Sequence, residues 1–211
     1  MTLLYDVSLP IGPELPVWPG DPPVAISKSV GLPAVSELRL SSHAGTHVDA
    51  PAHCVRKGVG VDQLPLAALI GPAWVVHLPG PGPIAAARLA GAGIPAGAIR
   101  LLLRTDPHAA RHAGRPAFDP DFAALAPDAA AWLIARGVRL VGIDAPSIEP
   151  FAAAEEFPVH QELLAAGMII VENLALDGIV PGPYQLICLP LRIIGGDGAP
   201  ARVALARAED L

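Results

Sequence analysis

Short runs of aliphatic and β-branched residues recur along the chain from residue 73 onward, and glycine, proline or polar residues separate them. Such runs are typical of buried strands, because a strand that is covered on both faces has no polar side to present. We therefore predict buried strands within residues 73–78, 99–105, 138–144, 168–176 and 184–194.

The amino-terminal part carries weaker strand patterns. Residues 2–11 begin as a strand, and residues 36–42 alternate apolar and polar side chains. Strict alternation is typical of a strand with one face buried, so we predict a half-buried strand at residues 36–42.

Helical patterns lie between some of the predicted strands. Residues 128–137 start at Asp128, a potential N-cap, and end at Gly137, whereas residues 159–166 end before Gly167. Helix followed by buried strand, repeated, indicates an α/β domain. The chain has no internal repeat and no low-complexity linker, so we predict a single domain over residues 1–211.

Composition excludes several classes of partner. The net charge is −6 and aromatic residues make up 4% of the chain, so a nucleic-acid surface is not expected. Residues 63–87 carry no Asp, Glu, Lys or Arg, but five prolines interrupt them, so we expect no membrane span. With two cysteines and no signal-peptide pattern at the amino terminus, a reduced, cytoplasmic setting is expected.

The stretch HAGTHVDAPAH, residues 43–53, concentrates three histidines and an aspartate. Gly45 and Pro51 oppose a helix here. In an extended chain His47 and Asp49 point to the same face, roughly 6.6 Å apart along the strand. His43 can join them only if the chain curves, and Gly45 lies midway between the two histidines.

This stretch predicts a metal or catalytic site. Imidazole and carboxylate ligands suit Zn²⁺ or Mn²⁺, and Asp49 has two oxygens with which to bridge two ions. His53 is a candidate for a further ligand or for a proton shuttle. The alternative is that these histidines only bond to the backbone of a tight turn.

A metal site needs at least three ligands, and the chain offers two further candidates. His160 lies in the second helical pattern, and Glu172 interrupts an apolar strand. A carboxylate there is unfavourable unless it is paired or binds metal, although it could also be a strand-end charge that faces water.

The remaining polar groups are interpreted as structural. His108 and His112 are expected on a solvated surface, and Cys54 is expected to be an inert buried thiol. We expect loop or strand-end charges at Asp144, Glu149, Glu155 and Glu156. Asp144 is also a candidate to support the site from behind the ligands.

The same stretch resembles the signature H-x-G-[TA]-H-x-D-x-P-x-H of the cyclase family of metal-dependent hydrolases, which includes bacterial kynurenine formamidase (arylformamidase) and isatin hydrolase. The resemblance extends over nearly the whole chain. It includes PVWPGDPP near the amino terminus, GIDAPSIEP followed by FPVHQELLAAGMIIVENLAL, and the closing segment YQLICLPLRIIGGDGAPARVAL.

The resemblance implies a role for individual residues and a fold. It implies two divalent metal ions, with Zn²⁺ favoured over Mn²⁺, a general acid/base and an aromatic residue that lines the substrate pocket. It also implies a swivelling β/β/α domain with a mixed sheet core, assembled as a homodimer or homotetramer. The implied ligands are His43, His47 and Asp49 for the first ion and His160 for the second, with Asp49 and Glu172 bridging; His53 is the acid/base and Trp18 the pocket residue.

We therefore expect an amide hydrolase that acts on a small aromatic amide. N-formylkynurenine, an intermediate of tryptophan degradation, is the first-choice substrate, and isatin or another cyclic amide or lactone is the alternative. A hydrolase of this kind would use a water molecule activated by the metals. An alternative of another class is a non-catalytic protein that uses the metals to bind a small ligand.

Overall fold

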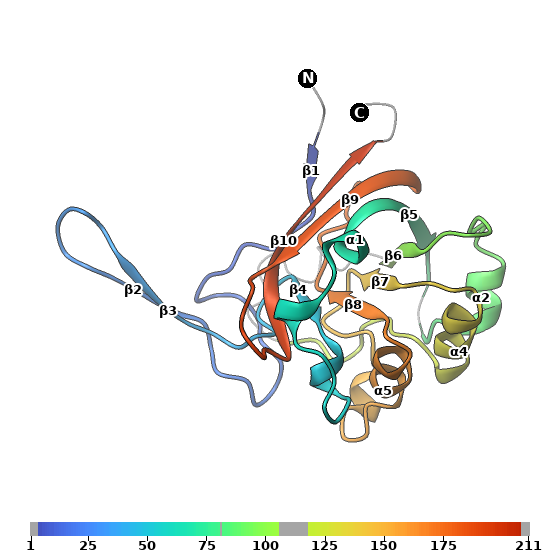
Figure 1. Ribbon diagram of the computed structural model, residues 1–211, viewed down its shortest axis with the longest axis horizontal. Helices are drawn as coiled ribbons and strands as arrows, with labels where there is room; N and C mark the ends of the chain where they lie inside the picture. Colours follow the sequence, from blue (N-terminus) through green and yellow to red (C-terminus); the bar gives the residue numbers. More distant parts are fainter. Residues whose placement is uncertain (1–3, 81, 106–117, 208–211) are drawn as a thin grey trace.

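The computed structural model describes residues 4–80, 82–105 and 118–207 (Figure 1). The strands are β1 (Leu4–Asp6), β2 (Ala25–Lys28), β3 (Ser36–Arg39), β4 (His47–Asp49), β5 (Ile70–Leu78), β6 (Arg100–Thr105), β7 (Leu140–Ile143), β8 (Ile169–Glu172), β9 (Gly182–Pro190) and β10 (Gly198–Arg207). The α-helices are α1 (Leu66–Leu69), α2 (Ala86–Ala90), α4 (Pro127–Ala135) and α5 (Pro158–Ala165), and short 3₁₀ helices are η1 (Pro51–His53), η2 (Val61–Gln63) and η3 (Phe151–Ala153).

The main sheet closes into a mixed barrel. Its strand order is β1-β10-β4-β8-β7-β6-β5-β9, and β9 also pairs with β10, so the seven strands from β10 to β9 form a closed ring. Strands β5 to β8 run parallel to their neighbours within that group, whereas β4, β9 and β10 pair antiparallel. The mixed sheet of the predicted α/β fold is thus observed, and the swivelling β/β/α arrangement stays a prediction.

Strands β6, β7 and β8 are mainly apolar because both of their faces are covered. On β6, Leu102 points into the barrel, whereas Leu101 and Leu103 belong to a separate core between the barrel and the helices. Leu133 of α4 and Leu163 of α5 lie in that second core. Figure 1 shows α2, α4 and α5 gathered on one side of the barrel. Two cores on opposite faces of one strand explain the continuous hydrophobic runs.

Most predicted strands are confirmed with shifted ends. Strands β5 to β9 fall within or overlap the five predicted runs, and the ends of both predicted helices are close to those observed. Gly137 and Gly167 follow α4 and α5 with φ of +72° and +75°, the left-handed conformation in which glycine commonly ends a helix.

Two local predictions are wrong. Residues 36–42 do not form a half-buried strand: β3 is exposed along its whole length, because it pairs only with β2 in a hairpin that projects from the barrel (Figure 1). Asp128 is not the N-cap of α4, since Ala126 holds that place. The Asp128 carboxylate instead accepts a hydrogen bond from the backbone N–H of Ala86, which ties α4 to the start of α2.

Every helix in the part of the chain that the structure describes is too short or too polar to span a bilayer.

Candidate metal centre

Strand β4 carries the first two candidate ligands on one face. It lies between β8 and β10, with His47 opposite Glu172 and Asp49 opposite Gly198. The side chains of His47 and Asp49 converge, so that Nε2 of His47 lies 3.4 Å from Oδ1 of Asp49. The extended geometry that the sequence predicts is therefore confirmed.

A sharp turn at Gly45 brings His43 to the same place. Gly45 has a φ of +65°, a conformation that residues with a Cβ rarely adopt. The imidazole rings of His43 and His47 have centroids 5.0 Å apart, and Nδ1 of His43 lies 2.9 Å from Oδ1 of Asp49. The predicted curve at Gly45 is confirmed.

Two residues distant in sequence complete the cluster. His160 lies in the first turn of α5, and Glu172 is the last residue of β8. Both side chains are buried, so the alternative that Glu172 is a strand-end charge facing water is wrong. Nε2 of His160 lies 3.2 Å from Oε1 of Glu172 and 3.6 Å from Oδ2 of Asp49.

The two carboxylates divide their oxygens between two histidines. Oδ1 of Asp49 and Oε2 of Glu172 lie 3.4 Å and 3.3 Å from Nε2 of His47. Their other oxygens, Oδ2 of Asp49 and Oε1 of Glu172, lie beside Nε2 of His160. Each carboxylate thus faces both histidines, as it would if it bridged two cations.

These separations fit ligands of a metal ion. Two ligand atoms, each about 2.1 Å from one tetrahedral ion, are roughly 3.4 Å apart. Nε2 of His47 and Oδ2 of Asp49 are buried and make no hydrogen bond to any described residue. Buried polar atoms without partners are unfavourable in a finished core, and bound cations would satisfy both atoms. Imidazole and carboxylate groups that could hold a metal ion therefore meet here.

Each imidazole is also held from its outer side. Nδ1 of His47 lies 2.8 Å from the carbonyl oxygen of Gly45, to which it donates, so Nε2 is the nitrogen left to face the carboxylates or a metal ion. Nδ1 of His160 lies 3.2 Å from Oε2 of Glu149. Metal-binding histidines commonly donate their second ring nitrogen to a carbonyl or carboxylate in this way, which orients the ring.

The electrostatics of the cluster favour positive charge at its centre. Burial by itself would lower the pKa of His47, but the carboxylates of Asp49 and Glu172 outweigh it and raise that pKa to about 10. Burial would raise the pKa of Glu172, as would Asp49, yet the nearby imidazoles of His160 and His47 hold it at about 2. Protons and metal ions therefore compete for the same negative field.

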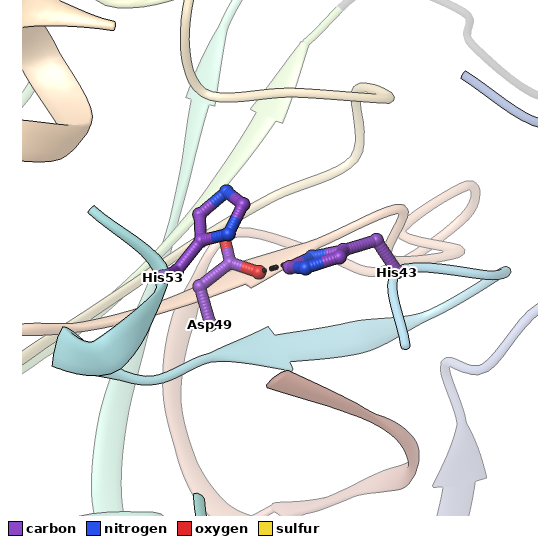
Figure 2. Close-up of side chains that lie close together, drawn as sticks. All are labelled: His43, Asp49 and His53. Atoms are coloured by element: carbon purple, nitrogen blue, oxygen red, sulfur yellow. Dashed lines mark hydrogen bonds and ion pairs between the residues drawn. The ribbon is translucent and has the colours of Figure 1, made fainter. Parts of the chain in front are cut away.

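His53 lies at the edge of this cluster, at the end of η1 (Figure 2). Ligand atoms of His43, Asp49 and His53 lie within 4.8 Å of one another, and the His43 and His53 rings have centroids 4.3 Å apart. Burial lowers the pKa of His53, although the charge of Asp49 opposes this shift. A neutral imidazole beside the cluster can accept a proton near pH 7.

Asp197 is a site residue that the sequence reasoning missed. Its Oδ2 lies 2.9 Å from Nε2 of His43 and 3.8 Å from Nδ1 of His53. The backbone N–H of Ala50 donates to the carbonyl oxygen of Asp197, which ties this loop to the histidine stretch. The sequence pattern that could have indicated it is an acidic residue between two glycines, directly before the last strand.

A cavity of about 200 Å³ opens onto the candidate ligands. Trp18 lines it, as the family resemblance implies, and its ring packs edge-on against Phe118 and Phe151 with centroids 5.1 Å and 5.3 Å apart. Phe157, which the sequence reasoning missed, lies on the wall beside His53 and His160. The cavity therefore combines a polar floor of candidate metal ligands with aromatic walls.

The other polar groups have mixed outcomes. Glu149 was expected as a loop or strand-end charge, but it is completely buried and contacts His160. Asp144 does not support the candidate ligands, because its carboxylate accepts hydrogen bonds from the backbone N–H and the hydroxyl of Thr105. Cys54 is only partly buried, not buried as expected, but burial still raises the pKa of its thiol, in keeping with an unreactive cysteine. His108 and His112 lie outside the described residues.

The fold of this chain is similar to that of several solved structures. A protein described as a potential metal-dependent hydrolase with cyclase activity is 34% identical, with a TM-score of 0.83 and 98% of each chain covered. A protein described as a predicted metal-dependent hydrolase from Bacillus stearothermophilus is also 34% identical, with a TM-score of 0.82 and the same coverage. Isatin hydrolase A from Labrenzia aggregata is 23% identical, with a TM-score of 0.83 over 98% of this chain and 94% of its own, and shares the fold.

The model of the Cyclase family matches residues 5–150, which include the whole histidine stretch. Together with the two relatives at 34% identity over nearly their full length, this match shows that the chain belongs to the cyclase family.

Proposed function

We propose that this protein is a metal-dependent amide hydrolase, with N-formylkynurenine as the first-choice substrate and kynurenine and formate as products. The observation that carries the proposal is the division of the Asp49 and Glu172 oxygens between His47 and His160. Two carboxylates that each face two imidazoles suit a pair of divalent cations, the arrangement that many hydrolytic metal sites use.

His43, His47, Asp49 and Glu172 would hold the first ion, and Asp49, His160 and Glu172 the second. A ligand set of imidazole and carboxylate suits Zn²⁺, which we favour, and also suits Mn²⁺. Metal-dependent hydrolase is also the description of both relatives at 34% identity.

Hydrolysis of an amide forms a C–O bond, breaks the C–N bond and requires a proton on the leaving nitrogen. Divalent cations, when bound, supply an acidic water and stabilise negative charge on the carbonyl oxygen. His53 has the position of the acid/base, since its ring centroid lies 4.3 Å from that of His43 and 5.7 Å from that of His160. It would accept a proton from the water and pass it to the leaving nitrogen.

The walls of the cavity support an aromatic substrate. Trp18, Phe118 and Phe157 line it, and aromatic rings pack well against one another edge-on or offset. An aryl amide would place its ring among these side chains and its carbonyl over the ligand cluster. Isatin or another cyclic amide or lactone offers the same combination of ring and carbonyl and remains the alternative substrate.

The experiment is metal analysis of the purified protein, followed by rates on N-formylkynurenine and isatin side by side. We expect about two equivalents of metal, loss of activity after exhaustive chelation, and recovery on addition of Zn²⁺ or Mn²⁺. Full turnover by a verified metal-free sample would exclude the metal mechanism. Stoichiometric metal with no turnover of any amide, but tight binding of aryl ligands, would favour a non-catalytic binding protein.

We also propose a homodimer or homotetramer, in which the β2–β3 hairpin contacts another subunit. Val30 and Leu32 at its tip are almost fully exposed, as is much of Val35 and Leu38. An arm with four exposed aliphatic side chains is unfavourable in water, and burial against a second copy would remove that cost.

A further inference from the structure

Glu149 makes an unusual set of contacts for a residue in a loop. Its side chain is completely buried between the loop after β7 and the start of α5. Oε2 accepts hydrogen bonds from the backbone N–H groups of Val159 and His160, at 2.9 Å and 3.0 Å, and lies 3.2 Å from Nδ1 of His160. One carboxylate oxygen therefore contacts both the helix start and the ring of a candidate ligand.

This contact determines which nitrogen of His160 carries hydrogen. An ionised carboxylate only accepts hydrogen bonds, so Nδ1 of His160 must donate. Nε2 is then free to present its lone pair to the centre, where Oδ2 of Asp49 and Oε1 of Glu172 lie. The opposite tautomer would place a lone pair against Glu149 and a hydrogen where a cation would bind.

Glu149 differs from the groups that hold the other two imidazoles. His47 donates to a backbone carbonyl, which carries no net charge, and His43 contacts Asp197, whose side chain is 48% exposed. Glu149 is fully buried, and its second oxygen has no hydrogen-bond partner among the described residues. A buried carboxylate acts on its neighbour with little screening, so its contact with Nδ1 makes Nε2 of His160 a stronger electron-pair donor than a carbonyl would.

The neighbouring residues hold Glu172, another candidate ligand that faces His160. The hydroxyl of Ser147 and the backbone N–H of Ile148 donate to Oε1 of Glu172, at 3.2 Å and 2.6 Å. The Ser147 hydroxyl also accepts from the backbone N–H of Glu149. Three consecutive residues thus orient Glu172 and His160 together.

We propose that Glu149 is a positioning residue that orients His160 and thereby sets the affinity of the second metal ion, held by Asp49, His160 and Glu172. The inference rests on the proposed two-ion site. It requires that a change at Glu149 weaken the second ion more than the first, because the Glu149 carboxylate contacts the first turn of α5 and the ring of His160.

Glu149→Gln tests this role without removing the oxygen that caps α5. Glutamine keeps an acceptor for the N–H groups of Val159 and His160 but has no charge. Asp144→Asn is the matched control, because Asp144 is also a buried carboxylate near the end of β7 and bonds to Thr105 rather than to a candidate ligand.

The measurement is a Zn²⁺ titration of metal-free protein in competition with a chelator of known affinity. We expect two ions in the wild type, and in Glu149→Gln an unchanged first affinity with a second affinity weakened about 10- to 100-fold. Asp144→Asn should bind both ions like the wild type. Long-range ¹H–¹⁵N spectra of the Zn²⁺-loaded wild type should show hydrogen on Nδ1 of His160.

Equal affinities in Glu149→Gln and the wild type would overturn the inference and leave the two-ion proposal intact. Equal weakening of both ions would also overturn it, because Glu149 would then act on the whole fold. Fewer than two ions in the wild type would overturn the two-ion proposal itself, and the inference with it.

Discussion

His47 on β4 stands directly opposite Glu172 on β8, and Nε2 of His47 lies 3.3 Å from Oε2 of Glu172. The pairing of two antiparallel strands thus joins residues 125 positions apart in one cluster. Because strand pairing sets this distance, the two side chains are held close together before any ion binds. Substitution of either residue should therefore lower metal affinity and activity.

Glu172→Gln should remove metal and activity together. Glutamine is uncharged and its nitrogen cannot ligate as a carboxylate oxygen does, so both ions lose a ligand. We expect metal content to fall and kcat/KM to drop more than about 100-fold. This loss exceeds the roughly 10- to 100-fold typical of a residue that only supports a metal ligand. Metal analysis and the amide assay check this, with the exposed Glu162→Gln as control. Wild-type metal content in Glu172→Gln would contradict the assignment.

His53→Ala should retain both ions but lose turnover. Proton transfer by a positioned side chain contributes about 10²- to 10⁴-fold, so we expect kcat to fall by that factor. Metal stoichiometry measured on the same sample separates the two roles of His53. Loss of one equivalent of metal would make it a ligand, since it lies in a cluster with His43 and Asp49.

Gly198→Ala should distort the centre, because Gly198 faces Asp49 across β4 and β10. An added Cβ would lie 2.7 Å from the carbonyl oxygen of Val48 and 3.0 Å from the ring of His43. We expect a loss of about 1–3 kcal/mol in the free energy of unfolding and weaker metal binding. Gly12→Ala, where an added Cβ meets nothing within 4 Å, is the control. An unchanged free energy of unfolding and an unchanged metal affinity in Gly198→Ala would contradict this prediction, because β4 and β10 would then accommodate the added Cβ without cost.

Asp144 should make stability depend on pH. Burial raises its pKa to about 7, although hydrogen bonds from Thr105 oppose this shift, whereas in the unfolded chain it is near 3.9. A raised pKa in the folded state stabilises the fold fully below pH about 4, and this stabilisation is lost as pH rises through 7. Relative to Asp144→Asn, the wild type should lose about 2–3 kcal/mol between pH 5 and 8.

Urea unfolding of both proteins at several pH values measures this difference. Because every other titrating group is common to the two proteins, its contribution cancels in the comparison. A difference that does not change with pH would mean that Asp144 is ionised throughout.

Replacing Val30 and Leu32 by serine should shift the protein from the oligomer toward the monomer. Both side chains lie at the exposed end of the β2–β3 hairpin, and their burial between subunits would be lost. We expect sedimentation to show a shift toward a single chain. Leu66→Ser, at another exposed aliphatic position on α1, should leave the mass unchanged. A wild type that is itself a monomer would contradict the proposal.

The sequence alone was sufficient for the periodic features of the fold. Apolar runs marked β5 to β9, and they are most continuous in β6 to β8, because strands covered on both faces need few polar residues. Gly137 and Gly167 marked helix ends, and Gly45 marked the turn in the histidine stretch, because each requires a conformation that glycine adopts readily. Such features can be predicted from short segments, because they depend on the burial pattern or the backbone conformation of the segment itself.

Only the tertiary structure decided which polar residues meet. Glu149 and Asp197 look like ordinary loop charges in the sequence, yet one is buried against His160 and the other contacts His43. The exposure of β3 was equally hidden, because alternation does not say whether a partner covers the apolar face. Burial and contact depend on strand pairing and barrel closure, which join distant segments and leave no periodic trace in the chain.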